Sequence, residues 1–279
     1  MQDIFPVIVS AFIIGFGAVL IYYYSRKPSH ARTWNRDQVI LPAISTYGPL
    51  VTIHNIRNIR YQSEDEYDVN YYDKTFKLSD VVAAWFIIEP FGPKLPFGLQ
   101  AAHTFISFEL RSSEFISISV EIRKKKNDTF SSIGALKGLF RTFEIMYVIA
   151  DERDVIQLRT THRKDVVRLY PLNLTSTAVQ DIFVSFALDI NQLYQSAAFF
   201  HTLFENCTTV ALRHMRRGGA TLPAWHISYL FPENLDALLY SHSLIATSLP
   251  LEEARERFFI TEKAQQCGDT DEFSACIRS

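Results

Sequence analysis

The hydrophobic pattern begins with an uninterrupted apolar block at the N-terminus. Residues Ile4 to Tyr24 include no charged side chain over 21 positions. As a helix, such a block is about 30 Å long, the thickness of the hydrocarbon core of a bilayer. It ends in three consecutive tyrosines followed by Arg26 and Lys27, as is typical of a membrane interface. The segment lacks the basic start and the small-residue cleavage site of a signal peptide. The pattern predicts one uncleaved transmembrane anchor, residues 1–24.

After the apolar block the chain is first polar and then alternates between polar and apolar residues. Residues 25–48 are polar and contain proline and glycine, so they predict a tether, which leaves residues 49–279 as one domain. Runs with a period of two predict half-buried strands, and the continuously apolar Val81–Ile88 predicts a buried one. Two hairpins are predicted, 103–110 with 115–123 and 144–150 with 155–160, and further strands at 51–57, 56–61 and 165–170.

The last hundred residues change to a helical period. Thr177–Gln195 has apolar residues at helical spacing, preceded by hydroxyl side chains that can cap a helix. A second helix is predicted over Cys207–Met215, ended by two glycines, and a third over Leu251–Phe259. Strands followed by helices predict an α+β fold, with an antiparallel sheet and C-terminal helices.

Composition narrows the class of protein. Lys and Arg number 28 against 30 Asp and Glu, a formal net charge of −2, which argues against a partner that is a nucleic acid. A hydrophobic content of 48% argues against a disordered chain. We expect neither a metal site nor a cofactor.

The two indicators of topology disagree. Basic residues follow the apolar block and only Asp3 precedes it, so the positive-inside rule predicts a cytoplasmic domain. Cys267 and Cys276 point the other way. They lie nine residues apart in the tail and can close a disulfide loop in an oxidising compartment, although two free thiols are equally compatible with the spacing.

Cys207 is the first candidate for chemistry. It begins the predicted helix 207–215 directly after Asn206. Unpaired N–H groups and the helix dipole favour a thiolate there and can hold an oxyanion. A nucleophilic thiol needs a base. Among the eight histidines, His103 stands out because it begins a strand directly after the loop 93–102.

The first hairpin predicts a neighbour for His103. Apolar residues face apolar residues if a loop of three residues connects the strands, and His103 then lies opposite Glu121; a register shift of two would put Ser119 or Arg123 there. A carboxylate in that place could orient the imidazole, as in a Cys/His/acid set. An edge histidine beside an unrelated glutamate is the alternative. Arg123 is a candidate supporting residue, or an ion-pair partner of Glu121.

Five sequence strings carry a family resemblance. They follow one another in a fixed order and resemble the Lnb N-terminal periplasmic domain family of bacterial membrane-associated proteins, with weaker similarity that extends the match to roughly residues 34–278. The strings are Ala102-His-Thr-Phe-Ile-Ser-Phe108, Ile118-Ser-Val-Glu-Ile-Arg123, Tyr147-Val-Ile-Ala-Asp-Glu-Arg-Asp154, Leu169-Tyr-Pro-Leu172 and Glu205-Asn-Cys-Thr-Thr209.

The resemblance implies a fold and a site. Its order of histidine first and cysteine later is similar to that of circularly permuted papain-like enzymes, such as those resembling lecithin:retinol acyltransferase. By motif, His103 is the base and Cys207 the nucleophile. Asn206, directly before the helix start, is a candidate oxyanion support by its position. The role of Glu121 comes from the hairpin rather than from the family. The family also places residues 25–279 in the periplasm, and the apolar block then attaches the domain to the inner membrane by a single pass.

The resemblance also implies a reaction. The best-understood relatives are lipoprotein N-acyltransferases, which move a fatty acyl chain to an α-amino group through a thioester. The expected partners are therefore membrane lipid and a lipoprotein N-terminus. Residues 200–205 depart from the family pattern, which leaves the substrate open. Two alternatives remain: a cell-wall amidase or cysteine peptidase of the same thiol class, and a non-catalytic envelope binding module.

Overall fold

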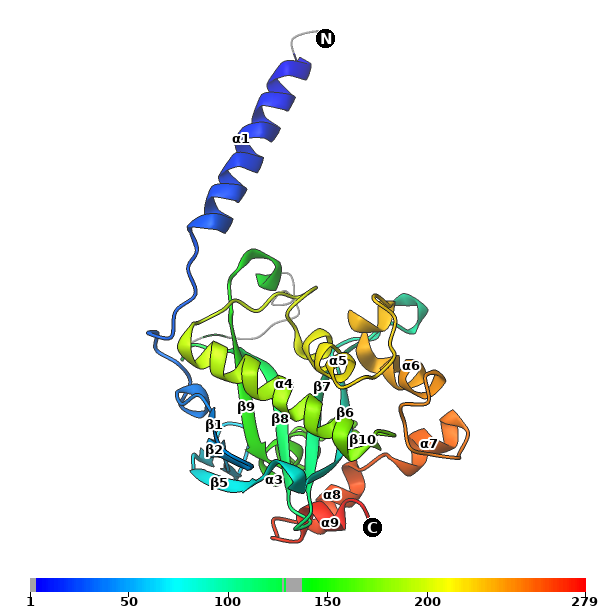
Figure 1. Ribbon diagram of the computed structural model, residues 1–279. Coiled ribbons are helices and arrows are strands. Elements are labelled where there is room, and N and C mark those ends of the chain that lie inside the picture. The colour runs from blue at the N-terminus through cyan, green and yellow to red at the C-terminus, as the bar shows by residue number, and fades with distance from the viewer. Residues whose placement is uncertain (1–3, 127, 129–136) are drawn as a thin grey trace.

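One mixed sheet forms the centre of the protein, in a computed structural model that describes residues 4–126, 128 and 137–279 (Figure 1). The strand order is β1-β2-β9-β8-β7-β6-β10, and β5 also pairs with β2. Neighbours are antiparallel except β2 and β9. The strands are β1 (Ala43–Tyr47), β2 (Leu50–Arg57), β5 (Tyr71–Lys77), β6 (Val81–Phe91), β7 (Ala101–Leu110), β8 (Phe115–Arg123), β9 (Glu144–Asp151) and β10 (Arg168–Pro171), and a separate pair is β3 (Arg60–Tyr61) with β4 (Tyr67–Asp68).

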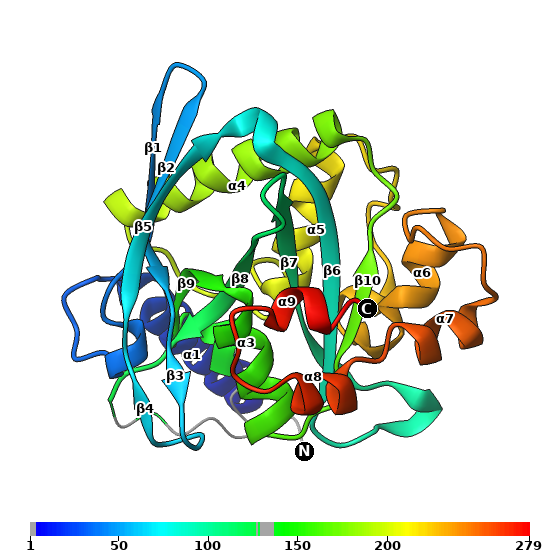
Figure 2. The same ribbon diagram turned by 90° about the horizontal axis from the view of Figure 1, so that it is seen from below.

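Helices cover both faces of this sheet (Figures 1 and 2). On one face, α4 packs through Phe183 and Phe186 against Phe108, and α5 joins the same core through Val210, Leu212 and Met215. On the other, α3, α8 and α9 enclose a second core around Phe105 and Phe273. The helices are α1 (Ile4–Ser25), α3 (Glu152–Gln157), α4 (Ser176–Gln195), α5 (Cys207–Arg217), α6 (Leu235–Ser241), α7 (Leu251–Arg257), α8 (Thr261–Cys267) and α9 (Phe273–Cys276).

The predicted α+β class is confirmed, with its mostly antiparallel sheet and one N-terminal apolar helix. Over Val7–Ser25, α1 is long and apolar enough to cross a membrane and none of it is buried, a description that fits an anchor or a signal sequence. The tail cysteines form a disulfide, Cys267–Cys276, with their Cα atoms 5.9 Å apart. The permuted papain-like arrangement stays a prediction.

The register of the β7–β8 hairpin follows the polar pattern. Phe105 pairs with Ser119 and Glu109 with Phe115. This is the register that brings His103 opposite Glu121, because each face of the two strands buries its own set of apolar residues.

The second predicted hairpin is wrong. After β9 the chain forms α3 and a turn of π-helix, Leu158–His162, instead of a strand. Asp151 caps α3 by accepting the N–H of Arg153 at 3.0 Å. The carboxylate of Asp154 is fully buried and accepts two hydrogen bonds of 2.9 Å from Arg57 on β2. These polar contacts fix a helix where the apolar pattern predicts a strand.

Much of the predicted tether packs on the domain. Trp34 is buried, residues 43–47 form β1, and His30 is hydrogen-bonded to the carbonyl of Leu193 at 2.8 Å. Residues 26–29 therefore separate the end of α1 from the first of these contacts. The division into anchor, tether and domain stays a prediction.

Candidate active site

A cavity of about 420 Å³ lies where β6 ends, β7 begins and α5 starts. Cys207, His103 and Glu121 all line it, together with the charged residues Arg159 and Glu89. Its apolar wall includes Phe91, Val120, Leu158 and Phe200. In the part of the chain that the structure describes, no group of His, Cys, Asp and Glu side chains could hold a metal ion.

His103 is oriented through a hydroxyl. Its Nε2 lies 2.8 Å from Ser119 Oγ, and Ser119 Oγ donates to Glu121 Oε1 at 3.2 Å. Nε2 and Glu121 Oε1 are 3.9 Å apart. Because the single proton of the Ser119 hydroxyl goes to Glu121, Nε2 must carry the proton that it shares with Ser119. The lone pair of the neutral ring is then on Nδ1, the nitrogen available to act as a base.

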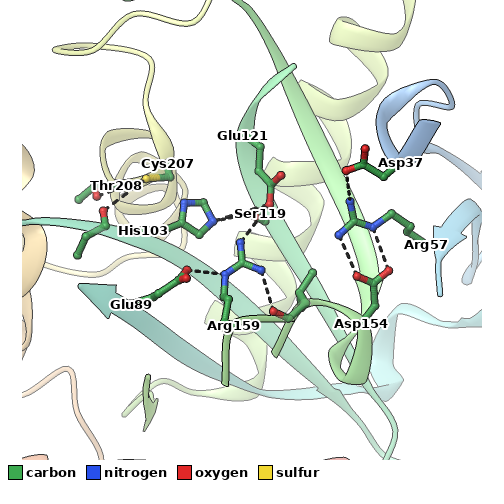
Figure 3. A network of polar contacts seen from close by, with 12 residues as sticks. Asp37, Arg57, Glu89, His103, Ser119, Glu121, Asp154, Arg159, Cys207 and Thr208 are labelled. Atoms are coloured by element: carbon green, nitrogen blue, oxygen red, sulfur yellow. Dashed lines mark hydrogen bonds and ion pairs between the residues drawn. The ribbon is translucent and has the colours of Figure 1, made fainter. Parts of the chain in front are cut away.

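Cys207 occupies the first position of α5. Its sulfur lies 4.0 Å from the carbonyl of Ala102 and 3.9 Å from Thr208 Oγ1, and Thr208 Oγ1 lies 3.1 Å from Thr104 Oγ1 on β7. In Figure 3 the imidazole of His103 lies between the sulfur and Ser119. No hydrogen bond joins Cys207 to the ring among the described residues, although both groups line the cavity.

The thiol and the imidazole are both neutral at rest. Burial raises the pKa of the Cys207 thiol, although hydrogen bonds from Thr104 and Thr208 oppose this. Burial, followed by the nearby charge of Arg159, lowers the pKa of His103 to about 3. The sequence predicts a thiolate favoured by the helix dipole. Desolvation in this cavity outweighs that effect, so a base would have to accept the proton of the thiol before the sulfur could act as a nucleophile.

Arg159 connects two carboxylates behind the histidine. Its Nε donates to Glu89 Oε2 at 2.5 Å, and its Nη2 donates to Glu121 Oε1 at 3.3 Å. Burial alone would raise the pKa of Glu121, but Arg159 and Arg57 together lower it to about 2, so this carboxylate stays ionised. Burial raises the pKa of Glu89 to about 7 against the opposing charge of Arg159.

Asn206 serves as the cap of α5. Its side-chain carbonyl accepts the N–H of Thr209 at 2.8 Å, and its amide donates to the carbonyl of Thr202 at 2.6 Å. Both ends of the side chain are therefore engaged in holding the helix start. The N–H groups of the first turn, beginning with Cys207 itself, are better placed than this amide to hold an oxyanion.

Arg123 lies outside the site. It is buried, and its guanidinium donates to the carbonyls of Gln38 at 2.9 Å and Val39 at 2.7 Å and lies over the ring of Trp34. It does not line the cavity. Arg123 thus holds residues 34–39 against β8, and the ion-pair partner of Glu121 is Arg159.

Sequence reasoning missed three residues of this site, Ser119, Arg159 and Glu89. Ser119 enters the argument only as an alternative neighbour of His103, although its place two residues before Glu121 puts both on the same face of β8. Arg159 lies in the segment predicted as a strand and carries no signal of its own. Only the fold brings it between Glu89 and Glu121.

Fold and site together define an α+β protein in which a cysteine at a helix start and a histidine on a strand line one cavity. The family model of the Lnb N-terminal periplasmic domain matches residues 67–239. The chain belongs to this family, as its five motifs predict, and the match is shorter than the predicted 34–278. It includes His103, Glu121 and Cys207. No curated protein and no solved structure matches the chain.

Proposed function

We propose that the protein is a membrane-anchored periplasmic enzyme that transfers an acyl group through a thioester on Cys207. One observation carries the proposal: Cys207 and the hydrogen-bonded series His103–Ser119–Glu121 line the same cavity. A nucleophile, a base and a group that orients the base are the parts that thiol catalysis requires.

The first half-reaction forms the thioester. His103 Nδ1 takes the proton of the thiol while the sulfur attacks the carbonyl carbon of an ester. N–H groups at the start of α5 hold the oxyanion, a contribution of about 3 kcal/mol per donor in known enzymes. The imidazolium is stabilised by Ser119 and by the ionised Glu121. It returns the proton to the departing alcohol, and the acyl group remains on Cys207.

The second half-reaction releases the acyl group. An amine attacks the thioester carbonyl and passes a proton to His103, and the sulfur leaves and recovers a proton from the imidazolium. The products are an amide and the free thiol. With water in place of the amine the same steps give a hydrolase, so the nature of the acceptor separates the acyltransferase from an amidase or peptidase.

Membrane phospholipid is the acyl donor that we propose, and a lipoprotein N-terminus is the acceptor. Two observations support this choice: the apolar α1, which we take as part of a membrane anchor over residues 1–24, and the family to which the chain belongs. The apolar side of the cavity, with Phe91, Leu158 and Phe200, suits an acyl chain. Residues 25–48 then connect the anchor to the domain 49–279 in the periplasm.

Intact-mass analysis of the full chain after incubation with phospholipid vesicles tests the proposal. We expect a fatty-acyl adduct that hydroxylamine removes, that Cys207→Ser abolishes, and that His54→Ala, a change at a half-buried histidine outside the cavity, leaves intact. Release of peptide from cell-wall fragments without an adduct would identify an amidase. If neither an adduct nor released peptide is found, and Cys207→Ser protein is fully functional in cells, the protein would be a non-catalytic binding module.

A further inference from the structure

The loop between β6 and β7 presents apolar side chains to solvent. Phe97 is 100% exposed and Leu95 45% exposed. The loop itself is well fixed. The N–H of Leu95 donates to the carbonyl of Leu99 at 2.7 Å, and the side chain of Gln100 donates to the carbonyl of Gly92 at 2.8 Å. The exposure is therefore a property of an ordered turn.

Phe97 occupies an unfavourable backbone conformation at the tip of this loop. Its φ is +64°, in the left-handed region that costs a non-glycine residue free energy. A fully exposed phenylalanine gains nothing from the folded domain that would offset this cost. A strained residue kept in place by its surroundings points to a role outside the fold.

A second apolar tip precedes Cys207. The chain makes a tight turn in which the N–H of Glu205 donates to the carbonyl of His201 at 2.9 Å. Phe204, at 67% exposed, and Leu203, at 39%, lie in this turn. Phe204 is stacked on His201 with ring centroids 4.9 Å apart, so this tip is also held in one conformation.

Both tips belong to segments that also contribute a side chain to the cavity. Phe91 of the first segment and Phe200 of the second line it, and Cys207 follows the second tip directly. We name the four residues Leu95, Phe97, Leu203 and Phe204 the apolar rim.

The apolar rim lies at the end of the domain from which α1 departs. The loop 92–100 and the segment 196–206 are both at that end in Figure 1. Residues 26–29 are all that separate α1 from His30, so the helix end and the domain cannot be more than about 18 Å apart.

Arg141 contacts both the end of α1 and the domain. Its guanidinium lies 4.2 Å from the ring centre of Tyr23 and 5.9 Å from that of Phe199. Tyr23 belongs to the tyrosine run at the predicted membrane interface. Arg141 thereby links this interface to the segment that carries Phe204.

We propose that the apolar rim inserts into the interfacial region of the bilayer that α1 crosses, and that the cavity opens onto the lipid surface. Aromatic and leucine side chains are those that partition into this region. Arg26 and Lys27 after the tyrosine run of α1, and Arg141 over the ring of Tyr23, suit anionic headgroups. That the lipid brought to Cys207 is the acyl donor rests on the proposed function. The insertion of the rim rests on the anchor alone and not on the proposed reaction.

Depth measurement on the full chain tests the proposal. A spin label is placed at Phe97→Cys or Phe204→Cys in Cys207→Ser protein, reconstituted in vesicles of phosphatidylethanolamine and phosphatidylglycerol. The accessibility of each label to two reagents is measured: oxygen, which concentrates in lipid, and a nickel chelate, which stays in water. We expect labels at both rim positions to be accessible to oxygen and shielded from nickel. Tyr47→Cys, at an 87% exposed tyrosine in the β1–β2 turn, is the matched control and should be accessible to nickel.

Each other outcome overturns the proposal. Rim labels that nickel reaches as readily as it reaches the control would place the rim in water. Rim labels shielded from both reagents would indicate a second protein surface. Because the measurement uses Cys207→Ser protein, it is independent of catalysis, and absence of an acyl adduct would refute the proposed function alone. In active protein, Phe97→Ser with Phe204→Ser should slow reaction on vesicles by about tenfold, and Tyr47→Ser should not.

Discussion

His103 and Glu121 face each other across β7 and β8 without a hydrogen bond between them, with Nε2 and Oε1 3.9 Å apart. The hydroxyl of Ser119 lies between them and contacts both. The carboxylate therefore acts on the ring through a neutral group. Its own charge is balanced by Arg159. Burial, followed by the charge of Arg159, lowers the pKa of His103, so the ring is oriented by Glu121 and yet remains unprotonated.

Ser119→Ala should lower the rate of thioester formation by about tenfold, because His103 loses the contact that fixes its tautomer and ring orientation. The binding of substrate should change little. Intact-mass time courses measure the rate. Ser117→Ala is the matched control: Ser117 lies two residues away on the same strand, and its buried hydroxyl has no partner among the described residues. An equal loss in both variants would show that Ser119 acts only in packing.

The rate should not fall between pH 8 and pH 5 through protonation of His103. Its pKa is about 3, so the base is unprotonated throughout this range. Glu89, with a pKa of about 7, is the cavity group that titrates here. Any inflection near neutral pH should therefore disappear in Glu89→Gln. An inflection near pH 6.5 that persists in Glu89→Gln would show that His103 has an ordinary pKa.

Acid should destabilise the fold through its buried histidines. The pKa of His214, like that of His103, is lowered to about 3, mainly by burial. The unfolded chain then binds more protons than the folded one below pH 6.5, so stability is complete above that pH and decreases as pH falls. When the pH is lowered from 7.5 to 5, each of these two histidines should lower the free energy of unfolding by about 2 kcal/mol.

Unfolding of the detergent-solubilised full chain in urea at the two pH values measures this loss. His214→Gln should reduce the difference between pH 7.5 and 5 by about 2 kcal/mol, whatever its effect at either pH alone. His242→Gln, at an exposed position, should keep the wild-type difference. Equal pH dependence in wild type and His214→Gln would contradict the prediction.

The domain should lie in the periplasm. An alkaline-phosphatase fusion at the C-terminus should be active, because that enzyme folds with disulfides that need an oxidising compartment. In protein taken from the envelope, peptide mapping without reduction should find Cys267 and Cys276 joined and Cys207 free. An inactive fusion with an active cytoplasmic reporter, or alkylation of both tail cysteines, would place the domain in the cytoplasm.

The pattern of apolar residues predicted the elements whose faces are buried against the sheet. The β7–β8 hairpin with its register, α4 and the start of α5 follow from local periodicity alone, since a shift by one residue would expose a whole apolar face. This hairpin is also why His103 and Glu121 could be paired in advance.

Elements stabilised by distant polar contacts could not be predicted in this way. The run Val155-Ile-Gln-Leu158 is compatible with strand or helix, and the decision is made by Asp154 and its buried pairing with Arg57, 97 residues away in sequence. The partners of Arg159 and the neutral state of Cys207 could not be predicted for the same reason. Both depend on which segments enclose the cavity, and the local spacing of residues does not indicate this.

The raised pKa of Cys207 has a consequence for a protein exposed to an oxidising compartment. Thiolates, far more than thiols, exchange with disulfides and react with peroxide. A cysteine held in its protonated form is therefore a poor partner for the disulfide exchange that joins Cys267 to Cys276 and a slow target for oxidants. In the proposed mechanism, the desolvation that makes Cys207 depend on His103 for proton transfer also keeps the sulfur chemically intact before a substrate arrives.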